Sequence, residues 1–267
     1  MVEPIAFETY DHSFCEATLY STRPHPEYFN SISSLFITFI GIQGFYRPFT
    51  GFFLKLLFAA LAVNGLTSFF YHWTNEIGWG LMDRMSMILI AMSSTYLIFP
   101  HFHLIIRLER WKEVRKMVLA IHILVCSYFT LLFTIAGLHW EKVFNCLFGL
   151  FLISLVIFMF FVDKYREILE LPYEVLGYGW RGVKYIAWSG FFWIVTESLC
   201  NEVEWMKYMM GHVFWHIFVS YGGYLLSLVP NYLSLKQKKD WIVLKKDCVS
   251  IPYLFCYNSS YSTSMNV

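Results

Sequence analysis

Five polar residues with useful chemistry lie in otherwise apolar stretches of the sequence. Ser68 and His72 fall in one apolar run, Asp83 opens the next, and His212 and His216 open another late in the chain. Ionisable groups at membrane depth are costly to bury, so a group of them indicates a functional site. Three imidazoles and a nearby carboxylate are the ligand and acid–base groups of a catalytic zinc centre.

The spacing of these residues supports that chemistry. Positions four apart on a helix are separated by about 40° of rotation and about 6 Å of rise, so each pair of residues shares one helix face. We interpret His72, His212 and His216 as zinc ligands that leave a fourth position for water. Asp83 would accept the proton of that water, and Ser68 would donate a hydrogen bond to the developing oxyanion.

Each residue also has a plainer interpretation. An intramembrane histidine is often a hydrogen-bonded packing residue, and the Ser68 hydroxyl can bond to its own helix backbone. Asp83 precedes Arg84 and can form an interfacial ion pair with it. The common depth of the five residues on three expected helices favours the shared site.

The composition indicates a membrane protein. The chain is 57% hydrophobic and 15% charged, with a mean hydropathy of +0.50, whereas soluble domains carry about 25% charged residues. A spanning helix needs about 20 mostly apolar residues. The seven candidate stretches are 29–46, 51–72, 82–100, 116–138, 142–162, 183–201 and 207–234. We predict an all-α fold, a bundle of seven transmembrane helices, with a tight connection at residues 75–80.

Basic residues are distributed unevenly between the two sides of this bundle. Fifteen Lys or Arg fall on one side, mainly in the loops around 107–116 and 163–182 and in the tail, and three fall on the other side. The positive-inside rule places the amino terminus in a lumen or outside the cell and the carboxy terminus in the cytosol. We expect a lumenal segment at 1–28, a transmembrane domain at 29–234 and a cytosolic tail at 235–267.

Two cysteines, Cys15 and Cys200, fall on the lumenal side of this topology, which would be oxidising. They are either a disulfide that ties the amino-terminal segment to the sixth span or two unrelated small residues.

Motifs along the chain resemble those of the alkaline ceramidases, in a superfamily of seven-span hydrolases that includes the adiponectin receptors. The shared pattern is Ser-x3-His, an Asp eleven residues after that His, and a late His-x3-His. Further similar stretches are Phe14-Cys-Glu16, Glu27-Tyr-Phe-Asn30, Gly190-Phe-Phe-Trp193 with Cys200, and Gly222-Gly-Tyr224.

The resemblance implies a zinc-dependent amidohydrolase that cleaves the N-acyl amide of ceramide to a sphingoid base and a fatty acid. It implies zinc at His72, His212 and His216, and catalytic roles for Ser68 and Asp83. It also implies that Cys15 pairs with Cys200. Ceramide and membrane lipids, rather than nucleic acid, are the expected partners. The expected location is the endoplasmic reticulum or Golgi, with the mitochondrial inner membrane as an alternative.

Several positions depart from the family pattern. The family binds calcium near the amino terminus, and Glu16, Glu27 and the carbonyl of Phe14 fit that site. Ser13 and Thr18, however, replace an Asp and an Asn, so we expect a weakened or absent calcium site.

Arg84 replaces a Glu, and Thr196 replaces an Asp of the sixth span. These departures motivate an alternative function, a weak or inactive subunit of a larger membrane complex in which zinc is a structural tie. A hydrolase of the same superfamily that acts on another acyl bond is a third hypothesis.

Overall fold

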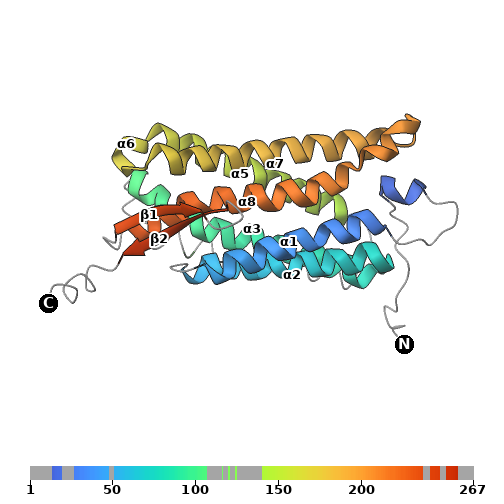
Figure 1. Cartoon of the computed structure of the whole chain (residues 1–267), viewed down its shortest axis with the longest axis horizontal. Coiled ribbons are helices and arrows are strands. Elements are labelled where there is room, and N and C mark those ends of the chain that lie inside the picture. The colour runs from blue at the N-terminus through green and yellow to red at the C-terminus, as the bar shows by residue number, and fades with distance from the viewer. Residues whose placement is uncertain are drawn as a thin grey trace.

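The computed structural model describes residues 14–19, 27–47, 51–106, 116, 120, 124, 140–236, 241–246 and 251–257. This part of the chain is mostly helical, and the long helices run along one common axis (Figure 1). The helices are α1 (Tyr28–Tyr46), α2 (Phe52–Thr74), α3 (Ile77–Ile106), α5 (Trp140–Lys164), the short α6 (Arg166–Leu169), α7 (Tyr173–Leu199) and α8 (Gly211–Lys236). Two 3-10 helices, η1 (Cys15–Leu19) and η2 (Glu204–Met209), lie at one end of the bundle (Figure 1).

The helices have the length and surface of membrane spans. Three helical stretches in the described residues are long and apolar enough to cross a bilayer, namely Phe52–Thr74, Ile77–Phe99 and Glu204–Lys236. Large apolar side chains also cover the outside of the bundle, among them Phe29, Phe160 and Ile194, each more than half exposed. The structure therefore supports a membrane protein. The expected span at 116–138 lies almost entirely outside the described residues, so the count of seven spans stays a prediction.

Helices α3 and α7 begin earlier than expected. The chain turns at Asn75, which ends α2 in the left-handed conformation, with φ of 56° and its N–H bonded to the carbonyl of Tyr71 at 2.7 Å. Because α3 then begins at Ile77, the expected connection at 75–80 is wrong, and most of that segment is helical. α7 begins at Tyr173 rather than at 183, directly after the extended Pro172.

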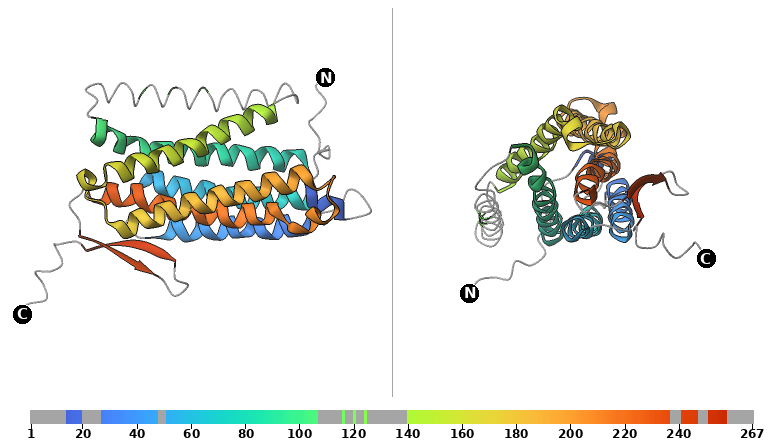
Figure 2. Two further views of the ribbon diagram at one scale, coloured as in Figure 1. Left: turned by 90° about the horizontal axis from the view of Figure 1, so that it is seen from above. Right: turned by 90° about the vertical axis from the view of Figure 1, so that its left-hand side faces the viewer.

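α8 lies between α7 and α1, as the end-on view shows (Figure 2, right). Glycines allow the close approach of α7 and α8. A Cβ atom at Gly182 would lie 2.5 Å from the carbonyl oxygen of Gly222, and one at Gly222 would lie 2.8 Å from that of Gly182. Small residues at such crossings let helix backbones pack closely in membranes, which fixes α8 and its two histidines against α7.

A β-hairpin corrects the expectation of an all-α chain. β1 (Trp241–Lys246) pairs antiparallel with β2 (Pro252–Tyr257) at the end of the bundle opposite η1 (Figure 1). The hydroxyl of Tyr224 on α8 donates to the carbonyl of Pro252 at 2.8 Å, and Leu254 is buried in the core. The hairpin therefore packs onto the bundle.

Candidate metal centre and cavity

Three histidines from two helices meet inside the bundle. His72 lies in the last turn of α2, and His212 and His216 lie in the first two turns of α8. One ring nitrogen from each can be chosen so that all three lie within 4.8 Å of one another, and all three side chains are buried. The convergence expected from the sequence is confirmed, and this group can hold a metal ion.

Hydrogen bonds orient two of the three rings. Nδ1 of His72 lies 2.6 Å from Oε2 of Glu27, and Nδ1 of His216 lies 2.9 Å from Oγ of Ser33. The Ser33 hydroxyl donates its proton to the carbonyl of Asn30 at 3.0 Å, so its oxygen accepts from His216. With Nδ1 protonated on both rings, Nε2 is left as the metal-binding atom, which is the arrangement typical of histidine ligands.

Ser33 and Ser34 were not expected at the site, and Glu27 was expected only as a calcium ligand. Oγ of Ser34 lies 3.3 Å from Nδ1 of His216. The signal was the cluster of polar residues in the first turns of the first apolar span, at Asn30, Ser31, Ser33 and Ser34, all of them buried. A polar cluster at that depth needs partners, and two of its members support a histidine.

Ser68 and Asp83 line the same cavity as the three histidines. Oδ1 of Asp83 accepts a hydrogen bond from Nδ2 of Asn64 at 2.8 Å, and Asn64 also contacts Oγ of Ser86 at 3.0 Å. Oγ of Ser68 lies 3.1 Å from Oγ of Ser34, the serine beside His216. The structure thus brings all five residues singled out in the sequence to one cavity.

The cavity has the size and lining of a lipid site. Its volume is about 920 Å³, near the upper end of ordinary ligand pockets. Most of its wall is apolar, with side chains such as Leu57, Phe58, Ile90, Phe144 and Phe148. The three histidines, Ser68 and Asp83 line the same cavity. An apolar chain of considerable length can therefore lie in the cavity while a polar group reaches the histidines.

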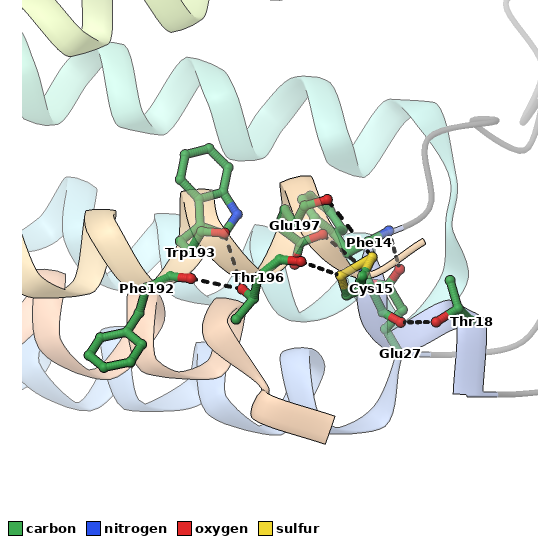
Figure 3. The surroundings of a disulfide bond; sticks show 9 residues. Phe14, Cys15, Thr18, Glu27, Phe192, Trp193, Thr196 and Glu197 are labelled. Atoms are coloured by element: carbon green, nitrogen blue, oxygen red, sulfur yellow. Dashed lines mark hydrogen bonds between the residues drawn. A yellow bond between two sulfur atoms is a disulfide. The ribbon is translucent and has the colours of Figure 1, made fainter. Parts of the chain in front are cut away.

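The segment around η1 is fastened over this site by a disulfide between Cys15 and Cys200, at the end of α7 (Figure 3). The backbone N–H of Cys15 donates to Oε2 of Glu197 at 2.8 Å. Beside it, the Phe14 ring lies 4.1 Å from the His212 ring, centroid to centroid. The expected disulfide is present, and because its thiols are consumed, Cys15 and Cys200 do not form a metal site with Glu197.

The two expected calcium ligands accept hydrogen bonds through all four of their carboxylate oxygens. Glu16 accepts from the backbone N–H groups of Phe29 and Asn30 at 2.7 and 2.8 Å, which stabilises the start of α1. Glu27 accepts from the N–H of Phe14 at 3.0 Å and from Asn30 and His72. The Thr18 hydroxyl donates to the carbonyl of Cys15, and Ser13 lies outside the described residues. Calcium binding stays a prediction.

Arg84 and Thr196, the other two residues that depart from the family pattern, have defined positions. Arg84 is buried on the cavity wall, where it donates to the carbonyl of Gly80 at 3.0 Å and lies over the Tyr71 ring. Its guanidinium therefore lies inside the bundle, in the same cavity as Asp83. Thr196 donates to the carbonyl of Phe192 at 2.9 Å within α7 (Figure 3).

Comparisons with known proteins agree with the geometry. The family model described as ceramidase matches residues 7–254. The alkaline ceramidase of Drosophila melanogaster is 23% identical over 193 residues, which cover 69% of this chain. The aligned region spans 62% of the length of that relative. Because the family model matches nearly the whole chain, this protein belongs to the ceramidase family.

Proposed function

We propose that the protein is a zinc-dependent hydrolase that cleaves the N-acyl amide of ceramide within the membrane. The observation that carries this proposal is the meeting of three buried histidines with Asp83 and Ser68 in one lipid-sized cavity. Three imidazole nitrogens suit zinc well among the metals available to proteins. When bound, zinc would supply Lewis-acid polarisation of the amide carbonyl and an acidified water.

The protein's own side chains supply proton transfer, a hydrogen bond to the oxyanion and the binding of the lipid chains. Asp83, held by Asn64 through Oδ1, takes one proton from the attacking water and returns it to the amide nitrogen as the C–N bond breaks. The products are a fatty acid, which keeps the water oxygen, and a sphingoid amine. Ser68 donates a hydrogen bond to the carbonyl oxygen as negative charge develops there. The apolar wall holds the acyl and sphingoid chains and excludes bulk water.

The proposal is tested with purified protein in detergent, by measuring its metal content and the products released from a panel of ceramides. We expect about one zinc per chain and release of sphingoid base. Asp83→Asn should lower the rate by a factor of about 10² to 10⁴ without lowering the zinc content. Asp163→Asn, at the far end of α5, is the matched control and should keep full activity. Full activity of Asp83→Asn would refute the assigned mechanism.

A second function is supported by the buried Arg84, which follows Asp83 and lines the same cavity. Arg84 puts a positive charge where the family pattern has a glutamate beside the catalytic Asp, which favours a site that has lost its catalytic role. In this case the metal joins α2 to α8 as a structural tie in a subunit of a larger membrane complex. Stoichiometric zinc without turnover on any ceramide would favour this function.

We also infer that the end of the bundle with η1 faces a lumen and the end with the hairpin faces the cytosol. The Cys15–Cys200 disulfide supports an oxidising compartment on the η1 side, and the uneven distribution of Lys and Arg supports the same orientation. Labelling of single introduced cysteines at the exposed positions Tyr208 and Val243 with a membrane-impermeant maleimide tests it in sealed vesicles. The endoplasmic reticulum or Golgi remains the predicted compartment.

A further inference from the structure

Two hydrogen-bond donors in the cavity have no role in the proposed chemistry. They are the hydroxyl of Tyr71 on α2 and the indole N–H of Trp193 on α7. Both side chains line the cavity, and both polar atoms are buried. Among the residues that the structure describes, neither proton has an acceptor, since the Arg84 guanidinium beside the Tyr71 hydroxyl can only donate to its oxygen. Buried donors are paired in nearly all native proteins, so two unpaired donors in one cavity indicate a ligand that pairs them.

The two donors lie beside different members of the histidine cluster. The Tyr71 ring is 5.2 Å from the His72 ring, and the Trp193 ring is 6.0 Å from the His212 ring, centroid to centroid. The His72 and His212 rings are themselves 4.9 Å apart. A polar group that reaches the histidines therefore lies beside both rings.

Packing holds both rings in these positions. Tyr71 is 3% exposed and makes an edge contact with Phe14, whose segment is tied to α7 by the disulfide. Trp193 packs against Trp215 with the ring centroids 5.3 Å apart. Rigid donors of this kind confer specificity, because they lose little conformational freedom when the acceptor arrives.

The ligand must therefore offer two acceptor oxygens close to the group that meets the histidines, together with long apolar chains. A sphingoid amide has this pattern. Its nitrogen-bearing carbon lies between one carbon with a primary hydroxyl and one with a secondary hydroxyl. A simple fatty amide lacks both hydroxyls.

We propose that Tyr71 and Trp193 bind the two hydroxyl oxygens of the sphingoid headgroup and so hold the amide between them at the histidine cluster. This inference rests on the proposed function and extends it to substrate recognition. Each donor forms one hydrogen bond to one hydroxyl. Tyr71 and Trp193 are thus specificity-determining residues, and they discriminate ceramide from amides that lack the hydroxyls.

The test crosses two variants with three substrates. Tyr71→Phe and Trp193→Phe each remove one donor, and the substrates are ceramide and its two analogues that lack either the primary or the secondary hydroxyl. A neutral hydrogen bond corresponds to a change of about fivefold in kcat/KM. On ceramide we expect each variant to lose about that factor. On the analogue that lacks the hydroxyl bound by the substituted residue, each variant should have the same kcat/KM as the wild-type protein.

The interaction between variant and substrate is the decisive readout, because a change that merely disturbs the cavity lowers kcat/KM on all three substrates alike. Trp188→Phe and Tyr208→Phe, at exposed positions outside the cavity, are matched controls and should leave every value unchanged. Equal losses on all substrates, or no loss on ceramide, would overturn the inference while leaving the proposed function intact.

If the wild-type protein hydrolyses no ceramide, the proposed hydrolase function fails, but recognition can still be tested. The same combinations of variant and lipid are then compared by the shift of the unfolding temperature that each lipid produces. A smaller shift for ceramide in Tyr71→Phe and Trp193→Phe, absent with the matching analogue, supports the inference. Identical shifts in all variants refute it.

Discussion

Oε2 of Glu27 lies 2.6 Å from Nδ1 of His72, and the backbone N–H of Glu27 also donates to the carbonyl of His72 at 2.9 Å. One residue at the start of α1 thus fixes both the ring and the main chain of a candidate ligand at the end of α2. Through its other carboxylate oxygen, Glu27 also accepts from the N–H of Phe14. The amino-terminal segment and the histidine cluster are therefore joined by a single buried carboxylate.

This relationship predicts the effect of Glu27→Gln on metal binding. A neutral amide orients His72 less strongly and no longer favours its protonated Nδ1, so we expect zinc affinity to fall by a factor of about 10 to 100. Competition with a chelator of known affinity measures the change. Glu167→Gln, at an exposed position on α6, should leave the affinity unchanged. Unaltered zinc affinity in Glu27→Gln would show that the contact does not support the ligand.

The disulfide should matter for both stability and the site. It closes a loop across 185 residues and holds η1 against α7. We expect the double variant Cys15→Ser with Cys200→Ser to unfold at a lower temperature, with a loss of about 2 to 5 kcal/mol. Zinc affinity should fall as well, because Phe14 no longer covers His212. Thermal unfolding in detergent and chelator competition measure the two effects. A variant that loses stability but keeps its zinc affinity would show that η1 does not support the metal centre.

The α7–α8 crossing predicts a contrast between two glycine substitutions. Gly182→Ala would place a Cβ atom 2.5 Å from the carbonyl oxygen of Gly222, so the helices must separate. We expect a loss of about 1 to 3 kcal/mol, measured as a lower unfolding temperature. Gly177→Ala on the same helix meets nothing within 4 Å and should be neutral or slightly stabilising. Equal stability of the two variants would argue against close packing at this crossing.

The ion pair at the far end of the bundle predicts a small pH dependence of stability. Nζ of Lys236 lies 2.6 Å from Oε2 of Glu170, and this hydrogen bond holds the pKa of the exposed Glu170 carboxyl below its usual value. Since the folded state has the lower pKa, the contribution is present above the ordinary glutamate pKa and is lost as the pH falls through the folded-state value.

We therefore expect Glu170→Gln to be slightly less stable than the wild-type protein near neutral pH. The difference should disappear in acid, below the pKa that Glu170 has in the folded state. Unfolding temperatures across this pH range, measured side by side, check the sign. A difference that grows as the pH falls would be inconsistent with the pair.

Local patterns in the sequence were sufficient for several features of the site. The helix period places Ser68 with His72 and His212 with His216 on shared faces, and hydropathy locates most of the helices that carry them. The shift in the start of α3 arose at Asn75, where a single left-handed residue is enough to turn the chain. Hydropathy does not register so short a turn.

The sequence by itself determined which residues could bind a metal and where most of the long helices lie, because both follow from residue type and from periods of a few residues. Only the tertiary structure decided which side chains, distant in the sequence, lie beside the candidate metal ligands. Glu27 and His72, Ser33 and His216, and the donors Tyr71 and Trp193 come from different helices. Their relative positions depend on which helix faces pack together. Close crossings, such as that of Gly182 on α7 with Gly222 on α8, fix which faces meet.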